Sequence, residues 1–137
     1  MSSLVATLKA QHVAVQKMAT EISKLVERKN IAGINAKLTD LKTALLGHLE
    51  LEDKNLYPAL IKAAEKKDPT AAETARMFST NMVGISSVLI GFLGKYEGKN
   101  FSADAFAQDW QGILGALGAR INSEEATLYP LFEKWTK

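Results

Sequence analysis

Two histidines and two acidic residues have the types and the spacing that a metal site requires. His48 and Glu52 lie four residues apart, so on a helix their side chains project from the same face, one turn apart. His12 and Glu124 fall at positions where otherwise apolar residues recur every three or four residues. Imidazole and carboxylate groups inside a bundle are rarely left without partners. We therefore expect these four residues to meet either a metal ion or one another in an ion-pair network.

Four long amphipathic segments would position these side chains. Three breaks divide the chain, at residues 29–33, 66–70 and 97–102. Within each segment apolar residues recur at steps of three and four, which is the spacing of a buried helix face, and no segment alternates as a strand does. Short connections make neighbouring helices antiparallel. The sequence predicts an all-α, up-down-up-down four-helix bundle that forms one domain over residues 1–137.

The composition limits both fold and function. The 137 residues, 47% of them hydrophobic and 23% charged, suffice for one hydrophobic core. The chain has 17 lysine and arginine residues and 15 acidic residues, a net charge of +2. The basic residues are scattered and form no stripe, so nucleic-acid binding has no electrostatic support. The absence of cysteine excludes thiolate ligands, disulfides and a cysteine nucleophile. No motif for nucleophilic catalysis or phosphate binding is found, which favours a binding protein over an enzyme.

Two segments bear on the location of the protein. The N-terminal residues have no basic region followed by a long apolar run, so we expect a cytoplasmic location. The uncharged stretch 77–94 has the minimum length of a membrane-spanning helix. Polar residues interrupt this stretch, however, and its large apolar residues fall on one stripe. We therefore predict a helix of the bundle here, and no membrane partner.

The segments around Glu52 and Glu124 repeat each other. Residues 48–58, HLELEDKNLYP, align without gaps on residues 120–130, RINSEEATLYP, at an offset of 72 residues. Both copies contain two consecutive acids and, after two further residues, Leu-Tyr-Pro. The repeat predicts that each half of the chain forms one helical hairpin. Proline has no backbone N–H, so Pro58 and Pro130 should kink or end their helices.

With these motifs the chain resembles the hemerythrin-like, HHE cation-binding family over nearly its whole length. The resemblance depends on His12 in the first helix, on the motif HxxxEDxxLYP that begins at His48, and on EExxLYP, which begins at Glu124. It implies a four-helix bundle around a non-haem iron centre, usually of two ions, that binds or senses dioxygen or handles iron and nitric oxide. It also implies that the metal ligands are His12, His48, Glu52 and Glu124.

Two positions depart from the family pattern. The place four residues before Glu124 usually holds histidine and here holds Arg120, and the third helix offers Asn81 and Met82 where a histidine is expected. A guanidinium group is not a metal ligand, and it pairs well with carboxylates. We expect Arg120, one turn from Glu124 and across from Glu52, to take the charge role of a second metal ion.

Two functions therefore stay open. In the first, the reduced ligand set holds one ion, or at most two, of Fe(II), Mn(II) or Zn(II), with open positions for a small diatomic ligand such as dioxygen or nitric oxide. In the second, the bundle contains no metal and serves in interaction or regulation, with Arg120, Glu52, Glu124 and the two histidines joined in a buried network.

Glycines inside the third and fourth helices are a further unusual feature. Each costs about 0.5–1 kcal/mol relative to alanine. We expect compensation from close packing of these two helices or, alternatively, from a homodimer contact. The glycines are Gly84, Gly91, Gly94, Gly112, Gly115 and Gly118.

The remaining residues of the repeat are expected to be structural or solvated. We expect the rings of Tyr57 and Tyr129 to pack at the end of the bundle with their hydroxyl groups near water. The acids Glu50, Asp53 and Glu125 lie off the inward stripe and should be solvated.

Overall fold

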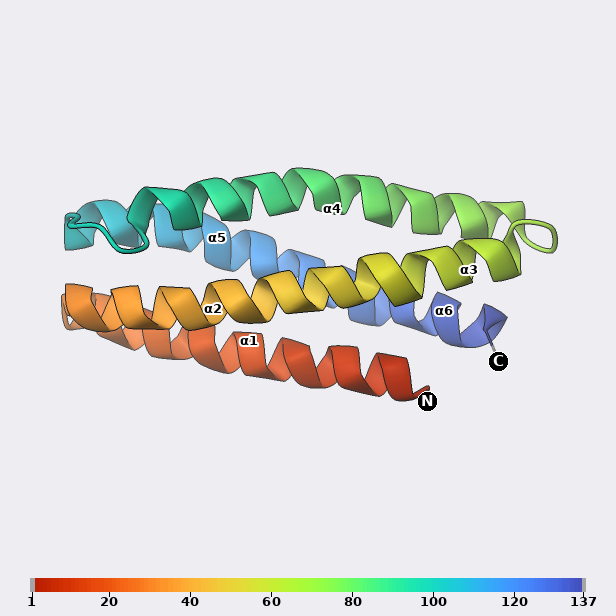
Figure 1. The fold of residues 1–137 in the computed structure, drawn as a ribbon, viewed down its shortest axis with the longest axis horizontal. Helices are drawn as coiled ribbons and strands as arrows, with labels where there is room; N and C mark the ends of the chain where they lie inside the picture. The colour runs from red at the N-terminus through yellow and green to blue at the C-terminus, as the bar shows by residue number, and fades with distance from the viewer. Residues whose placement is uncertain (1, 137) are drawn as a thin grey trace.

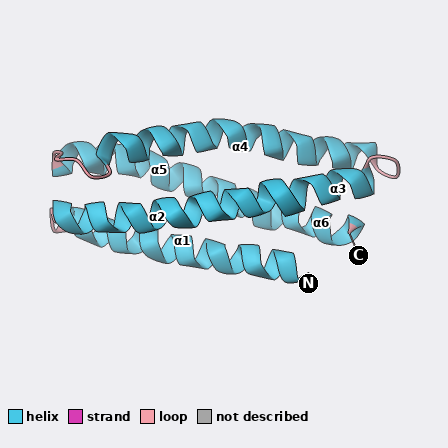
Figure 2. Cartoon of the chain, in the orientation of Figure 1, coloured by secondary structure: helices cyan, strands magenta, loops and turns pink. Residues whose placement is uncertain are grey.

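The computed structural model describes residues 2–136, which form an all-helical bundle (Figures 1 and 2). Four helical runs follow one another up and down, and no strand occurs among the described residues. The predicted fold class is confirmed. The first run is α1 (Ser3–Glu27), the second consists of α2 (Ile31–Leu51), η1 (Glu52–Leu56) and α3 (Tyr57–Ala64), the third is α4 (Pro69–Tyr96), and the fourth consists of α5 (Ala103–Ser123), η2 (Glu124–Leu128) and α6 (Tyr129–Trp135).

Side-chain caps begin all four runs at the breaks in the apolar pattern. The capping residues are Ser2, Asn30, Asp68 and Ser102. Each side-chain oxygen accepts a hydrogen bond from the backbone N–H three residues later, at 2.9–3.3 Å. These bonds satisfy donors that a helix N-terminus otherwise leaves free, so the starting points of the helices are encoded locally.

A polar layer divides the core into two apolar clusters. In α1 the buried stripe runs through Leu8, His12 and Val15, and the two apolar residues belong to different clusters. The same interruption occurs at His48 in α2 and at Glu124 in η2. Three helical runs therefore place polar side chains at one level of the bundle, with apolar packing on both sides.

Helix α4 is long and apolar. By its length and composition alone this helix could cross a membrane. In the structure α4 lies beside α3 and α5 (Figure 1). Four of its large apolar side chains are more than half exposed: Met77, Val83, Val88 and Ile90.

The expected close packing of the third and fourth helices through glycine is wrong. A Cβ atom added at any of the six glycines of α4 and α5 would meet no atom within 4 Å. These glycines face open space, because the helices pack through other faces. The homodimer contact stays a prediction.

Candidate metal centre

Both predicted acidic ligands begin a π-helical turn. Turn η1 starts at Glu52 and η2 at Glu124, and each is followed by Tyr-Pro. The tyrosine N–H donates to the carbonyl five residues earlier, from Tyr57 to Glu52 and from Tyr129 to Glu124. The next residue, proline, has no N–H for an α-helical bond, and the wider turn accommodates it. Each proline thus lies in the first turn of the following helix, α3 or α6, and each run continues through it instead of ending there.

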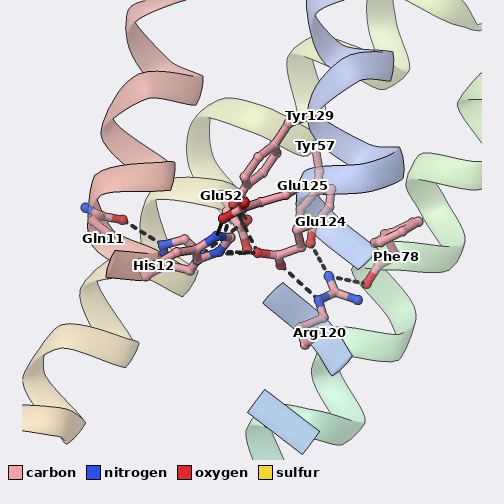
Figure 3. Close-up of polar contacts among 10 residues, drawn as sticks. Gln11, His12, Glu52, Tyr57, Phe78, Arg120, Glu124, Glu125 and Tyr129 are labelled. Carbon is pink, nitrogen blue, oxygen red and sulfur yellow. Dashed lines mark hydrogen bonds and ion pairs between the residues drawn. The ribbon is translucent and has the colours of Figure 1, made fainter. Parts of the chain in front are cut away.

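The four predicted ligands come together in the polar layer, and three of them, His12, Glu52 and Glu124, are labelled in Figure 3. All are buried, and their exposed fractions are between 0% and 6%. Ligand atoms of His12, His48 and Glu124 lie within 4.8 Å of one another. Glu124 Oε1 is 2.8 Å from His12 Nε2 and 3.3 Å from His48 Nε2. Glu52 stands beside this group, with its Oε2 atom 3.4 Å from His48 Nε2.

Hydrogen bonds on the outer nitrogens hold both imidazole rings. His12 Nδ1 lies 2.6 Å from Glu125 Oε2, and His48 Nδ1 lies 2.7 Å from Gln11 Oε1. An acceptor at Nδ1 favours a proton on that nitrogen, so in a ring that binds a metal ion Nε2 would be the ligand atom. The expectation that Glu125 is simply solvated is wrong, because its side chain, 40% exposed, reaches His12 from the edge of the bundle.

Arg120 lies on the other side of Glu124. It is 9% exposed, and its Nε donates to Glu124 Oε2 at 2.9 Å. Its Nη2 donates to Tyr57 Oη at 2.7 Å and to the Phe78 carbonyl at 3.1 Å. The predicted pairing with Glu124 is present. The predicted approach to Glu52 is not, since no bond within residues 2–136 joins the two, and Tyr57 and Phe78 take up Nη2 instead.

The two tyrosines belong to the site. Tyr129 Oη lies 2.9 Å from Glu52 Oε2 and 3.0 Å from Glu124 Oε1, and Tyr57 accepts the bond from Arg120. Burial and the charges of neighbouring glutamates raise the pKa of both phenols, so each keeps its proton. Their expected place near water is wrong, because both residues are at most 3% exposed.

The charges of the site are unevenly distributed in the metal-free protein. Burial alone would lower the pKa of His48, but Glu124 and Glu52 outweigh it and raise that pKa to about 9. Burial alone would raise the pKa of Glu124, but hydrogen bonds from both histidines and the charge of Arg120 hold it well below its usual range. Burial and the nearby charge of Glu124 raise the pKa of Glu52. A protonated His48 thus faces an ionised Glu124.

The donor set fits a divalent cation. Two atoms bound to one ion at about 2.1 Å, at right angles to each other, lie about 3 Å apart, and the distances from the histidine Nε2 atoms to the carboxylates are 2.8–3.4 Å. Glu52 Oε1 is fully buried and has no hydrogen-bond partner among the described residues, so a cation would satisfy it. Nitrogen and oxygen ligands without thiolate suit iron(II), manganese(II) or zinc(II).

A small cavity adjoins these ligands. Its volume is about 30 Å³, and it is walled by His12, His48, Glu124, Arg120 and apolar side chains of all four helical runs. A space of this size holds a water-sized group. From α4, Met82 reaches this wall, whereas Asn81 is exposed. Helix α4 contributes no residue to the described cluster of ligands.

The contact of Gln11 was not predicted, and Glu125, Tyr57 and Tyr129 lie in surroundings other than those predicted. Gln11 belongs to no motif, and nothing in the sequence distinguishes it from a surface residue. A signal for the tyrosines was present, because each stands five residues after a buried glutamate. Two residues that are five positions apart are hydrogen-bonded through the backbone in a π turn, whereas in an α-helix two such residues lie on different faces.

Comparison with known families identifies a domain family for this chain. The model of the hemerythrin HHE cation-binding domain matches residues 3–132. Comparison with curated proteins and with solved structures found no match. The family match covers nearly the whole chain and all four predicted ligands, and the structure brings those ligands together. The chain therefore belongs to the hemerythrin HHE cation-binding domain family.

Proposed function

We propose that the chain binds one divalent metal ion, iron in preference, and binds or senses a small diatomic ligand, dioxygen or nitric oxide, at that ion. One observation carries the proposal. Three buried donors, His12, His48 and Glu124, converge within 4.8 Å, and the unpartnered Oε1 atom of Glu52 is buried beside them.

Arg120 supports one ion over two. Glu124 Oε2 is taken by Arg120 Nε, so only its Oε1 faces the histidines. The positively charged guanidinium would repel a second cation next to it. The cluster that remains, with Glu52, offers two imidazoles and two carboxylates, which suit a single centre with open positions.

The surrounding residues would order the ligands and limit access. A bound ion would supply a Lewis-acidic centre, redox-active in the case of iron, with a position for a small ligand. Glu125 and Gln11 hold the imidazole rings, and the neutral Tyr129 hydroxyl restrains the carboxylates of Glu52 and Glu124. The cavity of about 30 Å³ excludes bulk water and selects for small size.

A metal-free regulatory bundle is the second candidate. It is favoured by the continuous hydrogen bonding from Arg120 through Glu124 to both histidines, which needs no ion. In such a network, removal of one partner leaves a buried charge and destabilises the fold by about 3–5 kcal/mol.

Metal content distinguishes the two candidates. The protein is loaded anaerobically with Fe(II), loosely bound ion is removed, and iron per chain is measured by elemental analysis. We expect a ratio close to one. A ratio near two would show that Arg120 does not replace a second ion. No retention of iron, zinc or manganese would contradict metal binding and support the network.

A pair of variants assigns the bound ion to this site. Glu52→Gln should weaken metal binding at least tenfold, because it removes a buried anionic donor. Glu50→Gln is the matched control, since Glu50 is exposed and its ion pair within residues 2–136 is with Lys54 on the surface. Equal metal affinity in both variants would place the ion elsewhere.

A further inference from the structure

A groove of about 600 Å³ runs along the surface between α4 and α5, and it is separate from the cavity of the metal centre. Arg120 lines both. Most of the groove wall is apolar and includes Ile85, Val88, Leu89 and Ala116. Its volume lies in the range of small-molecule sites, which are mostly apolar with a few placed polar groups.

Arg120 offers this groove an unused hydrogen-bond donor. Its Nε and Nη2 atoms bind Glu124, Tyr57 and Phe78, whereas Nη1 makes no hydrogen bond to any residue within 2–136 (Figure 3). The guanidinium also lies over the Phe78 ring, 4.9 Å from its centroid. Arg120 is 9% exposed and makes three hydrogen bonds, so a cationic donor is held in one orientation at the wall of the groove.

Two further polar side chains line the groove near Arg120. Asn81 follows Phe78 by one turn of α4, and Ser123 follows Arg120 by three residues on α5. Both are exposed, and neither side chain is hydrogen-bonded to a described residue. No acidic residue lines the groove, so the only charge on its wall is positive.

We propose that this groove binds a small amphipathic monocarboxylate. The carboxylate accepts hydrogen bonds from Arg120 Nη1 and from Asn81 and Ser123, and the hydrocarbon part lies along Ile85 and Val88. Glu124 already pairs with one edge of the guanidinium, so a single negative charge matches the group better than a phosphate does. The α4 helix of a second copy fits less well, because residues 77–94 contain no acid to meet Arg120.

Octanoate is the probe for this proposal. It is titrated into the full chain and followed by calorimetry and by amide shifts in NMR spectra. We expect saturable binding with shift changes along α4 and α5. 1-Octanol and octylamine have the same hydrocarbon chain without the carboxylate, and they should bind at least tenfold more weakly.

Two variants test the two ends of the groove. Asn81→Asp places a carboxylate near Arg120 and should weaken octanoate binding at least tenfold, while 1-octanol binding is unchanged. Thr80→Asp adds the same charge at the neighbouring position of α4, outside the groove, and is the control.

Ala116→Phe fills the apolar part of the groove and should abolish binding of octanoate and 1-octanol. Ala36→Phe, at an exposed position of α2, is its control and should leave both affinities unchanged.

Several outcomes would overturn the proposal. They are absence of saturable octanoate binding, equal binding of octanoate and 1-octanol, and octanoate binding that is indifferent to Asn81→Asp. A chain that dimerises through α4 and excludes octanoate from the dimer would assign the groove to a second copy. None of these measurements requires a metal, so they are independent of the proposed metal site.

Discussion

Glu125 and Asp53 stand at the same place in the two copies of the repeat, one residue after a buried glutamate, but their surroundings differ. Glu125 Oε2 lies 2.6 Å from His12 Nδ1, whereas Asp53 is exposed and has no hydrogen bond or ion pair with a described residue. A carboxylate on the outer nitrogen of a metal-binding imidazole orients the ring and raises its basicity. We therefore regard Glu125 as a positioning residue.

Removing this carboxylate tests its role. Glu125→Gln should lower metal affinity by about 10–100-fold, because an amide neither raises imidazole basicity nor holds the ring as firmly. The affinity is measured by competition with a chelator. Asp53→Asn removes a charge at the equivalent position and should leave affinity unchanged. Equal losses in the two variants would mean that overall charge, and not the contact with His12, sets the affinity.

The raised pKa of His48 predicts a pH dependence of the metal-free protein. The protonated ring is favoured in the folded state, so its contribution to stability is complete below pH 6.5 and is lost as the pH rises through about 9. The loss should amount to about 3 kcal/mol. Urea unfolding between pH 6 and pH 10 measures it. The pKa of Glu52 is also raised, so its contribution to the stability of the fold likewise decreases as the pH rises.

The control for this prediction is His48→Gln, which removes the titrating group. Its unfolding free energy should depend less on pH across the same range. An equally steep dependence in the variant would assign the effect to another group, and a flat profile in the parent protein would contradict the raised pKa.

At the scale of elements, the helical runs were predictable and the π turns were not. Apolar spacing and polar caps specify where each run begins and which face is buried, and both depend on nearby residues alone. A π turn instead depends on one extra residue within a continuing helix, and its sequence signal, Tyr-Pro after a buried glutamate, is equally compatible with a kink. Pro58 and Pro130 marked the right places with the wrong geometry.

The part of the site that lies on the buried apolar helix faces was predictable from the sequence. His12, His48, Glu52 and Glu124 interrupt buried apolar faces, and such faces meet in a bundle. Their convergence therefore followed from periodicity together with the resemblance of the motifs. Glu125 and Gln11 lie beside the stripes and approach the imidazoles from the edge, which requires knowledge of how neighbouring helices are rotated.

The open surroundings of the helical glycines predict a gain in stability. Gly115→Ala should raise the free energy of unfolding by about 0.5–1 kcal/mol, since the added Cβ meets no atom within 4 Å. Chemical denaturation measures the change. Gly33→Ala is the contrasting variant and should gain less stability, because its Cβ would lie 2.9 Å from Leu25 Cδ2 and 3.0 Å from Asn30 Nδ2, so both side chains must shift. Loss of stability in Gly115→Ala together with dissociation of a dimer would support the homodimer contact.

At the scale of the whole molecule, the polar layer joins three of the four helical runs. His12 comes from α1, His48 and Glu52 from the second run, and Glu124 from the fourth. Helix α4 supplies none of these four ligands: it walls the cavity with apolar side chains and accepts a hydrogen bond from Arg120 at the Phe78 carbonyl, and its outer face carries exposed apolar residues. Ligand binding at the centre should therefore stabilise the bundle unevenly.

Hydrogen exchange can detect this unevenness. Zinc(II), which does not change oxidation state, should slow amide exchange in α1, in α2 with η1, and in η2, and should have its smallest effect in α4. At a free ion concentration of 100 times Kd the overall gain is about 2.7 kcal/mol. Exchange is followed by mass spectrometry with and without the ion. Equal protection of α4 would show that this helix is coupled to the centre as strongly as the others.

The donors are also divided unequally along the chain, with His12, His48 and Glu52 before the α3–α4 connection and Glu124 after it. Neither hairpin holds the full set, so the ion would act as a bridge between halves. A chain cut within residues 65–68 would then behave as a complementation pair, in which reassembly of the two fragments reports the concentration of free metal. With a fluorescent group on each fragment, energy transfer between the two groups would measure this metal-dependent reassembly.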